Sequence, residues 1–262
     1  MTKLVSPANA SATEAKHTHS NNKAAAMEAF LGEILGTFIL VLVGHSVNAN
    51  VSLAGTAGNE SGWIVITWGW GIAVFIAVFM TADVSGAHLN PAVTLGLAAA
   101  GNFSWGLVPA YLTAQMIGAF LGAVCCWLQF KDHFNATEDP ATKLGVFSTA
   151  PAIPNTPINL LCEIIATFVL VLGVLYIAAP DVGLGALDAL PVALLVFGIG
   201  LGMGGTTGYA INPARDLGPR LAHAILPIEG KGPNNWSYAW VPVLGPLTGG
   251  VLAATLYRLL PF

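Results

Sequence analysis

Only 8% of the 262 residues are charged, so each polar group within the apolar stretches stands out as a candidate for chemistry. The stretch GYAINPARDLGPR at 208–220 places two arginines and an aspartate within six positions, and Arg215 directly follows an Asn-Pro-Ala triplet. A second such triplet stands at 90–92. Because Asn prefers the N-cap and Pro the first helical position, each triplet predicts the start of a helix.

Paired triplets of this kind predict a site for neutral, oxygen-bearing molecules. The side-chain oxygens of Asn90 and Asn212 would cap their own helices, which leaves each amide NH₂ as a donor toward a cavity. Two donors backed by the positive ends of two helix dipoles attract the lone pairs of a neutral solute and repel cations, including protons on a water chain. The alternative, that each triplet merely starts a helix, explains one copy better than two.

Other kinds of chemistry are not indicated. The sequence shows no nucleophile–base pair and no metal cluster, so we expect no enzymatic activity, no catalytic residue, no metal and no cofactor. Three cysteines, Cys125, Cys126 and Cys162, lie in apolar runs without metal-ligand spacing and are interpreted as small buried hydrophobic residues. No basic stripe is present, which argues against a nucleic-acid partner.

The elements that position these residues are predicted to be membrane helices. Hydrophobic residues make up 55% of the chain and its mean hydropathy is +0.72, whereas soluble domains carry about 25% charged residues. A spanning helix needs about 20 mainly apolar residues. We therefore expect an all-α protein in the lipid bilayer, with six transmembrane helices at 28–50, 61–83, 106–130, 157–179, 186–206 and 236–259. Two shorter apolar segments, 90–100 and 212–226, are interpreted as half-helices.

The chain also repeats. EILGTFILVL at 33–42 and EIIATFVLVL at 163–172 share seven of ten residues, and the two triplets are similarly spaced. Three spans in each half turn the second half upside down, and such an inverted repeat places a shared site near the bilayer midplane. We divide the chain into a polar tail at 1–27, predicted to be disordered and cytoplasmic, and a membrane domain at 28–262. Within that domain lie repeat one (28–130), a loop (131–156) and repeat two (157–262).

Both termini are predicted to be cytoplasmic, because the tail and the C-terminal end together hold more Lys and Arg than the 131–156 loop.

The segments that precede the triplets are expected to be extended, since non-helical backbone at membrane depth must line a cavity or be buried in protein. Their carbonyl groups would then line a wet path: Gly86, Ala87, His88, Leu89, Gly208, Tyr209 and Ala210. Glu33 and Glu163 occupy equivalent positions in the repeat, and we expect them to brace these segments by accepting backbone N–H groups; a proton relay is the weaker alternative. His88 is interpreted as a neutral side chain that lines the pore or braces the loop, and His45 and Trp105 as interfacial residues.

The two boxes, SGAHLNPAVT (85–94) and GYAINPARDLGPR (208–220), together with the paired Glu-bearing spans, resemble the major intrinsic proteins, which include aquaporins and glycerol facilitators. The resemblance covers roughly residues 28–260. It implies a right-handed bundle of six helices and two half-helices, an aquaporin-like channel domain with one pore per subunit, and a homotetramer in the plasma (inner) membrane. The triplet residues Asn90, Pro91, Ala92, Asn212, Pro213 and Ala214 match the family motif.

The same resemblance implies a selectivity filter of four residues. Arg215 follows the second triplet, and the other family positions fall on Trp70, Gly200 and Tyr209. Water-selective members resemble one another in having Phe and His at the two span positions, whereas here Gly200 leaves room. Two aromatic faces can receive an alkyl backbone while Arg215 donates to hydroxyl groups on the other edge.

Asp216, Arg220 and the 145–160 loop are likewise similar to the glycerol-conducting subfamily. We therefore expect a passive channel for glycerol, water and similar neutral solutes such as urea, with exclusion of ions and protons; a mainly water-selective channel is the alternative. An ion-coupled transporter and a purely structural junction protein are two further alternatives, and the sequence favours neither. A junction protein would tolerate a blocked pore, whereas Gly200 opens this one. A transporter would need an ion-coupling carboxylate beside the site.

Overall fold

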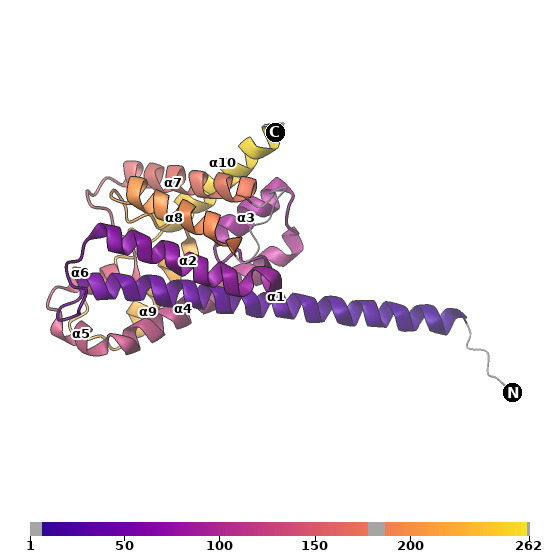
Figure 1. Ribbon diagram of the computed structural model, residues 1–262, viewed down its shortest axis with the longest axis horizontal. Coiled ribbons are helices and arrows are strands. Elements are labelled where there is room, and N and C mark those ends of the chain that lie inside the picture. Colours follow the sequence, from indigo (N-terminus) through magenta and orange to yellow (C-terminus); the bar gives the residue numbers. More distant parts are fainter. Residues whose placement is uncertain (1–6, 178–186, 261–262) are drawn as a thin grey trace.

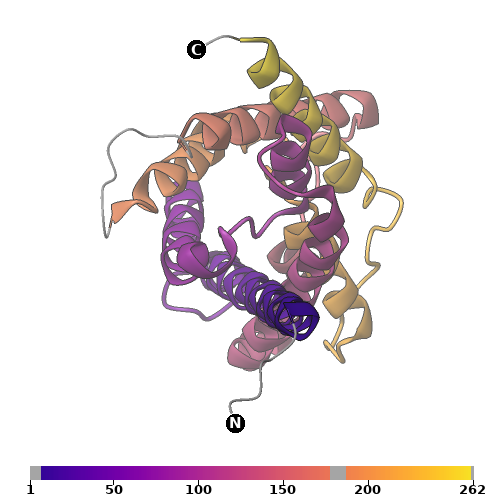
Figure 2. The ribbon, with the colours of Figure 1, turned by 90° about the vertical axis from the view of Figure 1, so that its right-hand side faces the viewer.

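The structure is a computed structural model that describes the backbone of residues 7–177 and 187–260, and side chains from residue 23 onward. Its regular elements are all helical within these ranges, which confirms the predicted all-α fold. The long helices lie roughly side by side and surround a central region, as Figures 1 and 2 show from two directions. In chain order the elements are α1 (Pro7–Ser52), α2 (Trp63–Ser85), α3 (Pro91–Ala100), the 3₁₀ turn η1 (Trp105–Leu107), α4 (Val108–Gln129), α5 (Lys131–Ala136), α6 (Pro140–Phe147), α7 (Thr156–Ile177), α8 (Leu190–Met203), α9 (Pro213–Ile225) and α10 (Val241–Leu259).

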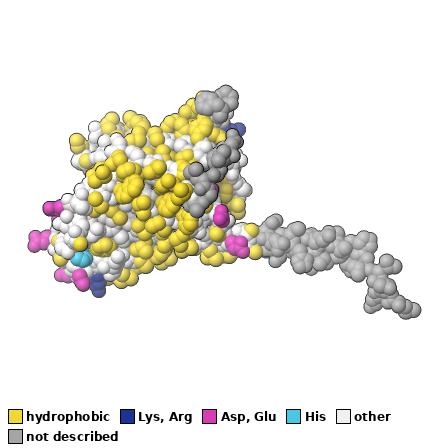
Figure 3. Space-filling view, in the orientation of Figure 1, with side chains coloured by type: hydrophobic (Ala, Val, Ile, Leu, Met, Phe, Trp, Pro, Cys, Tyr) yellow, Lys and Arg dark blue, Asp and Glu magenta, His cyan; other side chains and the backbone are white. Residues whose placement is uncertain are grey.

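Four of these helices are long and apolar enough to cross a membrane by length and composition alone: residues 23–52 of α1, then α2, η1 with α4, and α7. The other two predicted spans correspond to α8 and α10. The helix α8 is only 14 residues long, and the predicted start of that span at residue 186 lies outside the described residues. Figure 3 shows hydrophobic side chains over the middle of the bundle and charged side chains at its two ends, the pattern expected of a protein that crosses a bilayer.

The two halves interlock through their half-helices. In the first half α1 packs on α4, and in the second α7 packs on α10 in the same way. The half-helix α3 packs on α10 and the half-helix α9 on α4, so each contacts a long helix of the opposite half. Since α3 and α9 have only 10 and 13 residues, each ends inside the bundle rather than crossing it.

Close approach between the long helices depends on small residues that the repeat places in corresponding positions. A Cβ at Gly118 of α4 would lie 2.4 Å from the carbonyl oxygen of Ile34, and a Cβ at Gly249 of α10 would lie 2.3 Å from that of Ile164. Neither contact is possible for a side chain, so glycine is required at both. Small residues at such contacts let helix backbones meet in membranes, where dispersion and close packing drive association.

Two segments differ from the sequence prediction. Helix α1 begins at Pro7, so it extends into the tail for which composition predicts disorder. The tail is rich in alanine, the best helix former, and no further proline follows Pro7 before the membrane span. The 131–156 segment, predicted as a loop, contains the short helices α5 and α6; Asp139 caps α6 by accepting from the backbone N–H groups of Ala141 and Thr142.

Candidate functional site

The two Asn-Pro-Ala triplets begin the two half-helices as the sequence predicts. Asn90 Oδ1 accepts from the backbone N–H of Ala92 at 2.8 Å, and Pro91 is the first residue of α3. Asn212 Oδ1 accepts from Ala214 at 3.0 Å, and Pro213 is the first residue of α9. The positive ends of both helix dipoles therefore lie at the two asparagines.

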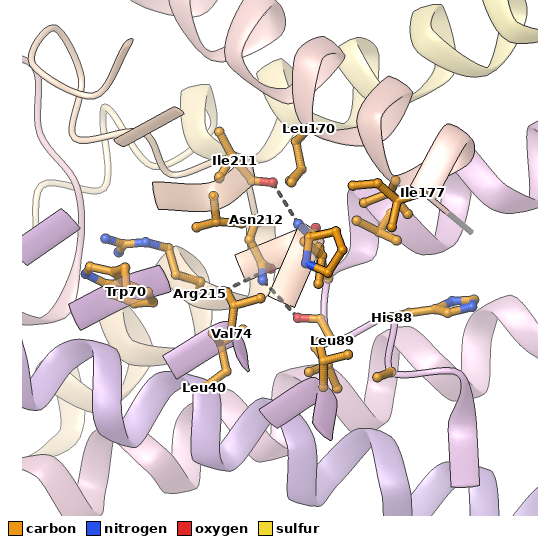
Figure 4. Close-up of a pocket in the computed structure, with 18 of the residues that line it drawn as sticks. Leu40, Trp70, Val74, His88, Leu89, Leu170, Ile177, Ile211, Asn212 and Arg215 are labelled. Atoms are coloured by element: carbon orange, nitrogen blue, oxygen red, sulfur yellow. Dashed lines mark hydrogen bonds between the residues drawn. The ribbon is translucent and has the colours of Figure 1, made fainter. Parts of the chain in front are cut away.

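The two asparagines also brace each other's segments across the centre of the bundle. Asn90 Nδ2 donates to the carbonyl oxygen of Ile211 at 2.8 Å, and Asn212 Nδ2 donates to that of Leu89 at 2.8 Å (Figure 4). Each amide has two N–H groups, so one of them in each asparagine remains for a solute. The prediction that the whole NH₂ group serves the cavity is therefore only half right, and the Leu89 carbonyl has a protein partner as well as a place in the cavity wall.

The segments before the triplets are irregular rather than uniformly extended. Positive φ angles occur at Gly86, Ala87 and Leu89 in the first half, and at the corresponding residues Gly208, Tyr209 and Ile211 in the second. A positive φ is uncommon outside glycine and is strained for a β-branched residue such as isoleucine. Among the described residues, no hydrogen bond ends on the carbonyl oxygens of residues 86–88 or 208–210, so these oxygens are free to accept from a solute.

Glu33 holds the first of these segments. Its carboxylate accepts from the backbone N–H groups of His88 and Leu89, both at 2.8 Å, and from the side chains of Ser85 and Gln115 at 2.9 and 2.7 Å. The side chain is fully buried. Bonds of this kind to a charged acceptor are stronger than neutral ones, which explains how a strained segment keeps its shape.

Glu163 does the same in the second half. It accepts from the backbone N–H groups of Ala210 and Ile211, both at 3.0 Å, and from the hydroxyl of Thr207 at 2.6 Å. The sequence hypothesis that the two glutamates brace the segments matches these contacts. Their oxygens are occupied by these N–H and O–H donors, an arrangement that suits an anchor better than a proton relay.

The residues around the triplets line two cavities of about 620 and 980 Å³. The first is lined by Asn90, Asn212 and the segments before the triplets, together with apolar side chains of α2, α7 and α8. The second lies beside α6 and the 233–237 loop. Three residues line both cavities, namely Trp70, Tyr209 and Arg215, so they stand where the two cavities meet. All seven residues predicted to line a path with their carbonyl groups border one cavity or the other.

Trp70 and Arg215 form the central pair of this junction. The guanidinium carbon of Arg215 lies 4.4 Å from the centroid of the Trp70 ring, a cation–π contact (Figure 4). Trp70 is 4% exposed, whereas Trp68, two residues earlier on the same helix, is 48% exposed. The Arg215 side chain has no hydrogen-bond partner among the described residues, and its buried Nη1 is unsatisfied. The guanidinium of Arg215 therefore lies at the positive end of the α9 dipole with N–H donors that bond to no other described residue.

The space beside Gly200, which the sequence predicts to be open, is filled by the ring of Tyr209. A Cβ at Gly200 would lie 2.9 Å from Cζ and 3.0 Å from the hydroxyl oxygen of Tyr209, so the tyrosine ring fills the room beside the glycine. The ring also packs edge-on against Trp63, with centroids 5.8 Å apart, while Trp63 Nε1 donates to the carbonyl of Gly200 at 3.0 Å. The Tyr209 hydroxyl is buried, and among the residues that the structure describes it has no hydrogen-bond partner.

Asp216 and Arg220 belong to the support of α9 and not to the cavity lining. Their side chains form a fully buried ion pair with a 2.7 Å contact. Asp216 also accepts from the backbone N–H and the hydroxyl of Thr149, and Arg220 donates to the carbonyl groups of Asn234 and Asn235. Because both charges are hydrogen-bonded in this way, the buried pair joins α9 to the segment around Thr149 and to the loop that contains Asn234 and Asn235.

Two histidines differ in their positions. His88 borders the first cavity, and its Nδ1 lies 3.1 Å from the hydroxyl of Thr94. His45, expected at the membrane interface, is fully buried beside Trp70, which makes that expectation wrong. In the described ranges no group of three or more His, Cys, Asp or Glu side chains could hold a metal ion.

Comparison with known proteins adds to this geometry. Residues 20–257 match the family described as major intrinsic protein. The chain is 54% identical over 232 residues to the "Glycerol uptake facilitator protein" of Bacillus subtilis (strain 168), an alignment that covers 88% of this chain and 84% of the relative. It is 54% identical over 232 residues to the "Probable glycerol uptake facilitator protein" of Thermotoga maritima, covering 88% and 99%. Among solved structures, the aquaglyceroporin from Plasmodium falciparum is similar with a TM-score of 0.77 and 31% identity, covering 89% of this chain and 96% of that one.

Proposed function

The chain belongs to the major intrinsic protein family, and from this premise we propose that it is a passive membrane channel that conducts glycerol together with water and other small neutral solutes. The observation that carries the proposal is the junction of the two cavities. There the unused donors of Arg215 stand over the face of Trp70, and Tyr209 lines both cavities as well. Glycerol has carbon atoms along one edge and hydroxyl groups along the other. Its carbons would lie on the aromatic rings while its oxygens accept from Arg215.

A solute that moves from the junction into the first cavity would meet polar groups of the protein along the cavity wall. The carbonyl oxygens of residues 86–88 and 208–210 accept from its hydroxyl groups, and the remaining N–H groups of Asn90 and Asn212 donate to its oxygens. The apolar side chains of α2, α7 and α8 form the rest of the first cavity wall. Each hydroxyl that loses water can therefore be paired with protein, which keeps the desolvation cost of passage low.

Exclusion of cations and protons follows from the fixed charges. The N-terminal ends of α3 and α9 meet at the two asparagines, and Arg215 adds a full positive charge close by. A cation in this region loses water and meets a positive potential. Protons that move along a water chain meet the same barrier. We therefore propose that Arg215 serves both glycerol recognition and cation exclusion.

We also propose the orientation and assembly that the family resemblance implies: both termini in the cytoplasm of a plasma (inner) membrane protein, and a homotetramer with a pore in each subunit. The start of α1 and the end of α10 lie at the same end of the bundle, away from α5 and α6, which supports placing both termini on one side (Figure 1). Native mass spectrometry of the detergent-solubilised protein tests the assembly, and a monomeric mass would contradict it.

Uptake of labelled glycerol by cells that lack other glycerol routes tests the function. We expect uptake to stop when the inner and outer concentrations are equal, and to be unaffected when ion gradients are dissipated. Accumulation above the outside concentration would indicate an ion-coupled transporter. Fast water movement without glycerol uptake would instead support the mainly water-selective alternative.

A further inference from the structure

One face of α1 holds the indole ring of Trp70. A Cβ at Gly44 would lie 2.5 to 2.6 Å from three atoms of that ring, so the ring rests directly on the backbone of α1. His45 meets the ring edge-on, with centroids 5.3 Å apart and an angle of 71°. Asn48 Oδ1 accepts from Trp70 Nε1 at 3.0 Å. Three residues of α1 therefore fix the position and the plane of the indole.

His45 also contacts the other member of the central pair. Its Nε2 lies 3.3 Å from the carbonyl oxygen of Arg215, and its Nδ1 forms a hydrogen bond with the carbonyl oxygen of Val146 on α6. The imidazole is fully buried between these groups. A single side chain thus joins the ring of Trp70, the backbone of Arg215 and the wall formed by α6.

These contacts bear on selectivity because little else orients the guanidinium of Arg215. Its donors have no hydrogen-bond partner in the described part of the chain, and its close contact is the Trp70 face at 4.4 Å. A rotation of the indole would therefore change the aromatic face offered to a solute and the direction of the Arg215 donors together. Both changes would occur where the two cavities meet.

We propose that His45 and Asn48 are positioning residues for selectivity: from α1 they set the distance and the angle between Trp70 and Arg215, and so the fit of the constriction to a polyol. This inference rests on the proposed function, and it assigns a part in selectivity to α1, a helix that carries none of the four filter residues. A residue that only stabilised the bundle would change the number of working channels, and so all fluxes in proportion. A positioning residue changes the ratio of glycerol to water permeability.

The test is N48L in proteoliposomes, with water and glycerol permeabilities measured on the same preparation by stopped-flow light scattering. Leucine has the same number of side-chain heavy atoms and the same branch point as asparagine but no acceptor, so Trp70 Nε1 loses its bond. The loss of one such bond shifts an orientational equilibrium by about fivefold, and we expect the glycerol-to-water ratio to fall by about that factor. The matched control is S46A, on the same helix, where the hydroxyl donates to Gln129. S46A should leave the ratio unchanged.

A double-mutant cycle makes the test specific. W70F removes the donor that Asn48 accepts from, so N48L should not change the ratio further in a W70F background. An equal fall in both backgrounds would overturn the proposal, because Asn48 would then act elsewhere. H45L is the second variant, and it decides the matter if N48L does not fold; a ratio equal to that of the wild type would again overturn the proposal. If the wild type conducts glycerol and the variants keep its glycerol-to-water ratio, only this inference is refuted. If the wild type conducts no glycerol, the proposed function is refuted as well.

Discussion

The substitution G200A probes the constriction through a single methyl group. The new Cβ would lie 2.9 Å from Tyr209 Cζ, 3.0 Å from its hydroxyl oxygen and 2.9 Å from Thr67 Cγ2. Carbon atoms in contact prefer about 3.5 to 4.0 Å, so the tyrosine ring must move by roughly 0.6 to 1 Å. Trp63 packs against the ring, and Tyr209 lines both cavities, so we expect the displaced ring to move toward the cavity junction.

A ring displaced toward Arg215 narrows the slot for glycerol more than for water, because glycerol is the larger molecule. Overpacking of this kind costs about 1 to 3 kcal/mol, and each 1.4 kcal/mol is a tenfold change in a rate. We therefore expect glycerol permeability to fall by about tenfold and water permeability by less than about threefold.

The assay is stopped-flow light scattering of proteoliposomes with the amount of reconstituted protein determined for each variant. G202A is the matched control, since it lies on the same helix and a Cβ there meets no atom within 4 Å. It should behave as the wild type does. Equal losses of water and glycerol permeability in G200A, or a G202A that matches G200A, would refute the reasoning that Tyr209 fills the space beside Gly200.

The remaining predictions concern the supports of the site and are measured as thermal unfolding in detergent. E163Q should lower the free energy of unfolding by about 1 to 3 kcal/mol, because the amide nitrogen of glutamine cannot accept from the N–H and O–H donors that now bond to the carboxylate of Glu163. The control is E138Q, since Glu138 is exposed. Equal stability of the two variants would contradict the bracing role of Glu163. Y209F removes a buried hydroxyl that has no partner within the described ranges, so it should leave the free energy of unfolding unchanged or raise it by about 1 kcal/mol, at an unaltered glycerol-to-water ratio. A destabilised protein would show that the hydroxyl has a partner. K231M removes three bonds of 2.6 to 2.9 Å to carbonyl oxygens at the end of α9 and should cost about 1 to 2 kcal/mol, whereas an unchanged melting temperature would mean that the lysine does not cap the helix.

The features that sequence reasoning predicted well depend on local rules or on the repeat. Asn-Pro at a helix start is a rule of neighbouring residues, so α3 and α9 begin where it predicts. The equivalence of Glu33 and Glu163 came from comparing the two halves, and their contacts are equivalent in the structure. A step of two residues turns a helix by about 200°, so Trp70 and Trp68 cannot both face the cavities, and in the structure Trp70 is the buried one.

The features that it missed depend on contacts between distant segments. No pattern along α1 shows that His45 will meet Trp70 and Arg215, since those residues come from α2 and α9. The available signal in the sequence is His45 with Asn48 three residues later in the same span; the sequence alone indicates an interfacial position for His45 and no role for Asn48. The room beside Gly200 was predicted as open space because the side chain that fills it comes from another segment.

Swelling of proteoliposomes directly measures whether the purified protein is by itself a passive path for glycerol. Vesicles with and without the protein are mixed with an inwardly directed glycerol gradient at several concentrations, and shrinkage followed by reswelling is recorded. We expect reswelling with the protein to be much faster than in protein-free vesicles, in proportion to the gradient over a wide range, and independent of any ion gradient. Rapid shrinkage followed by reswelling no faster than that of protein-free vesicles would contradict it.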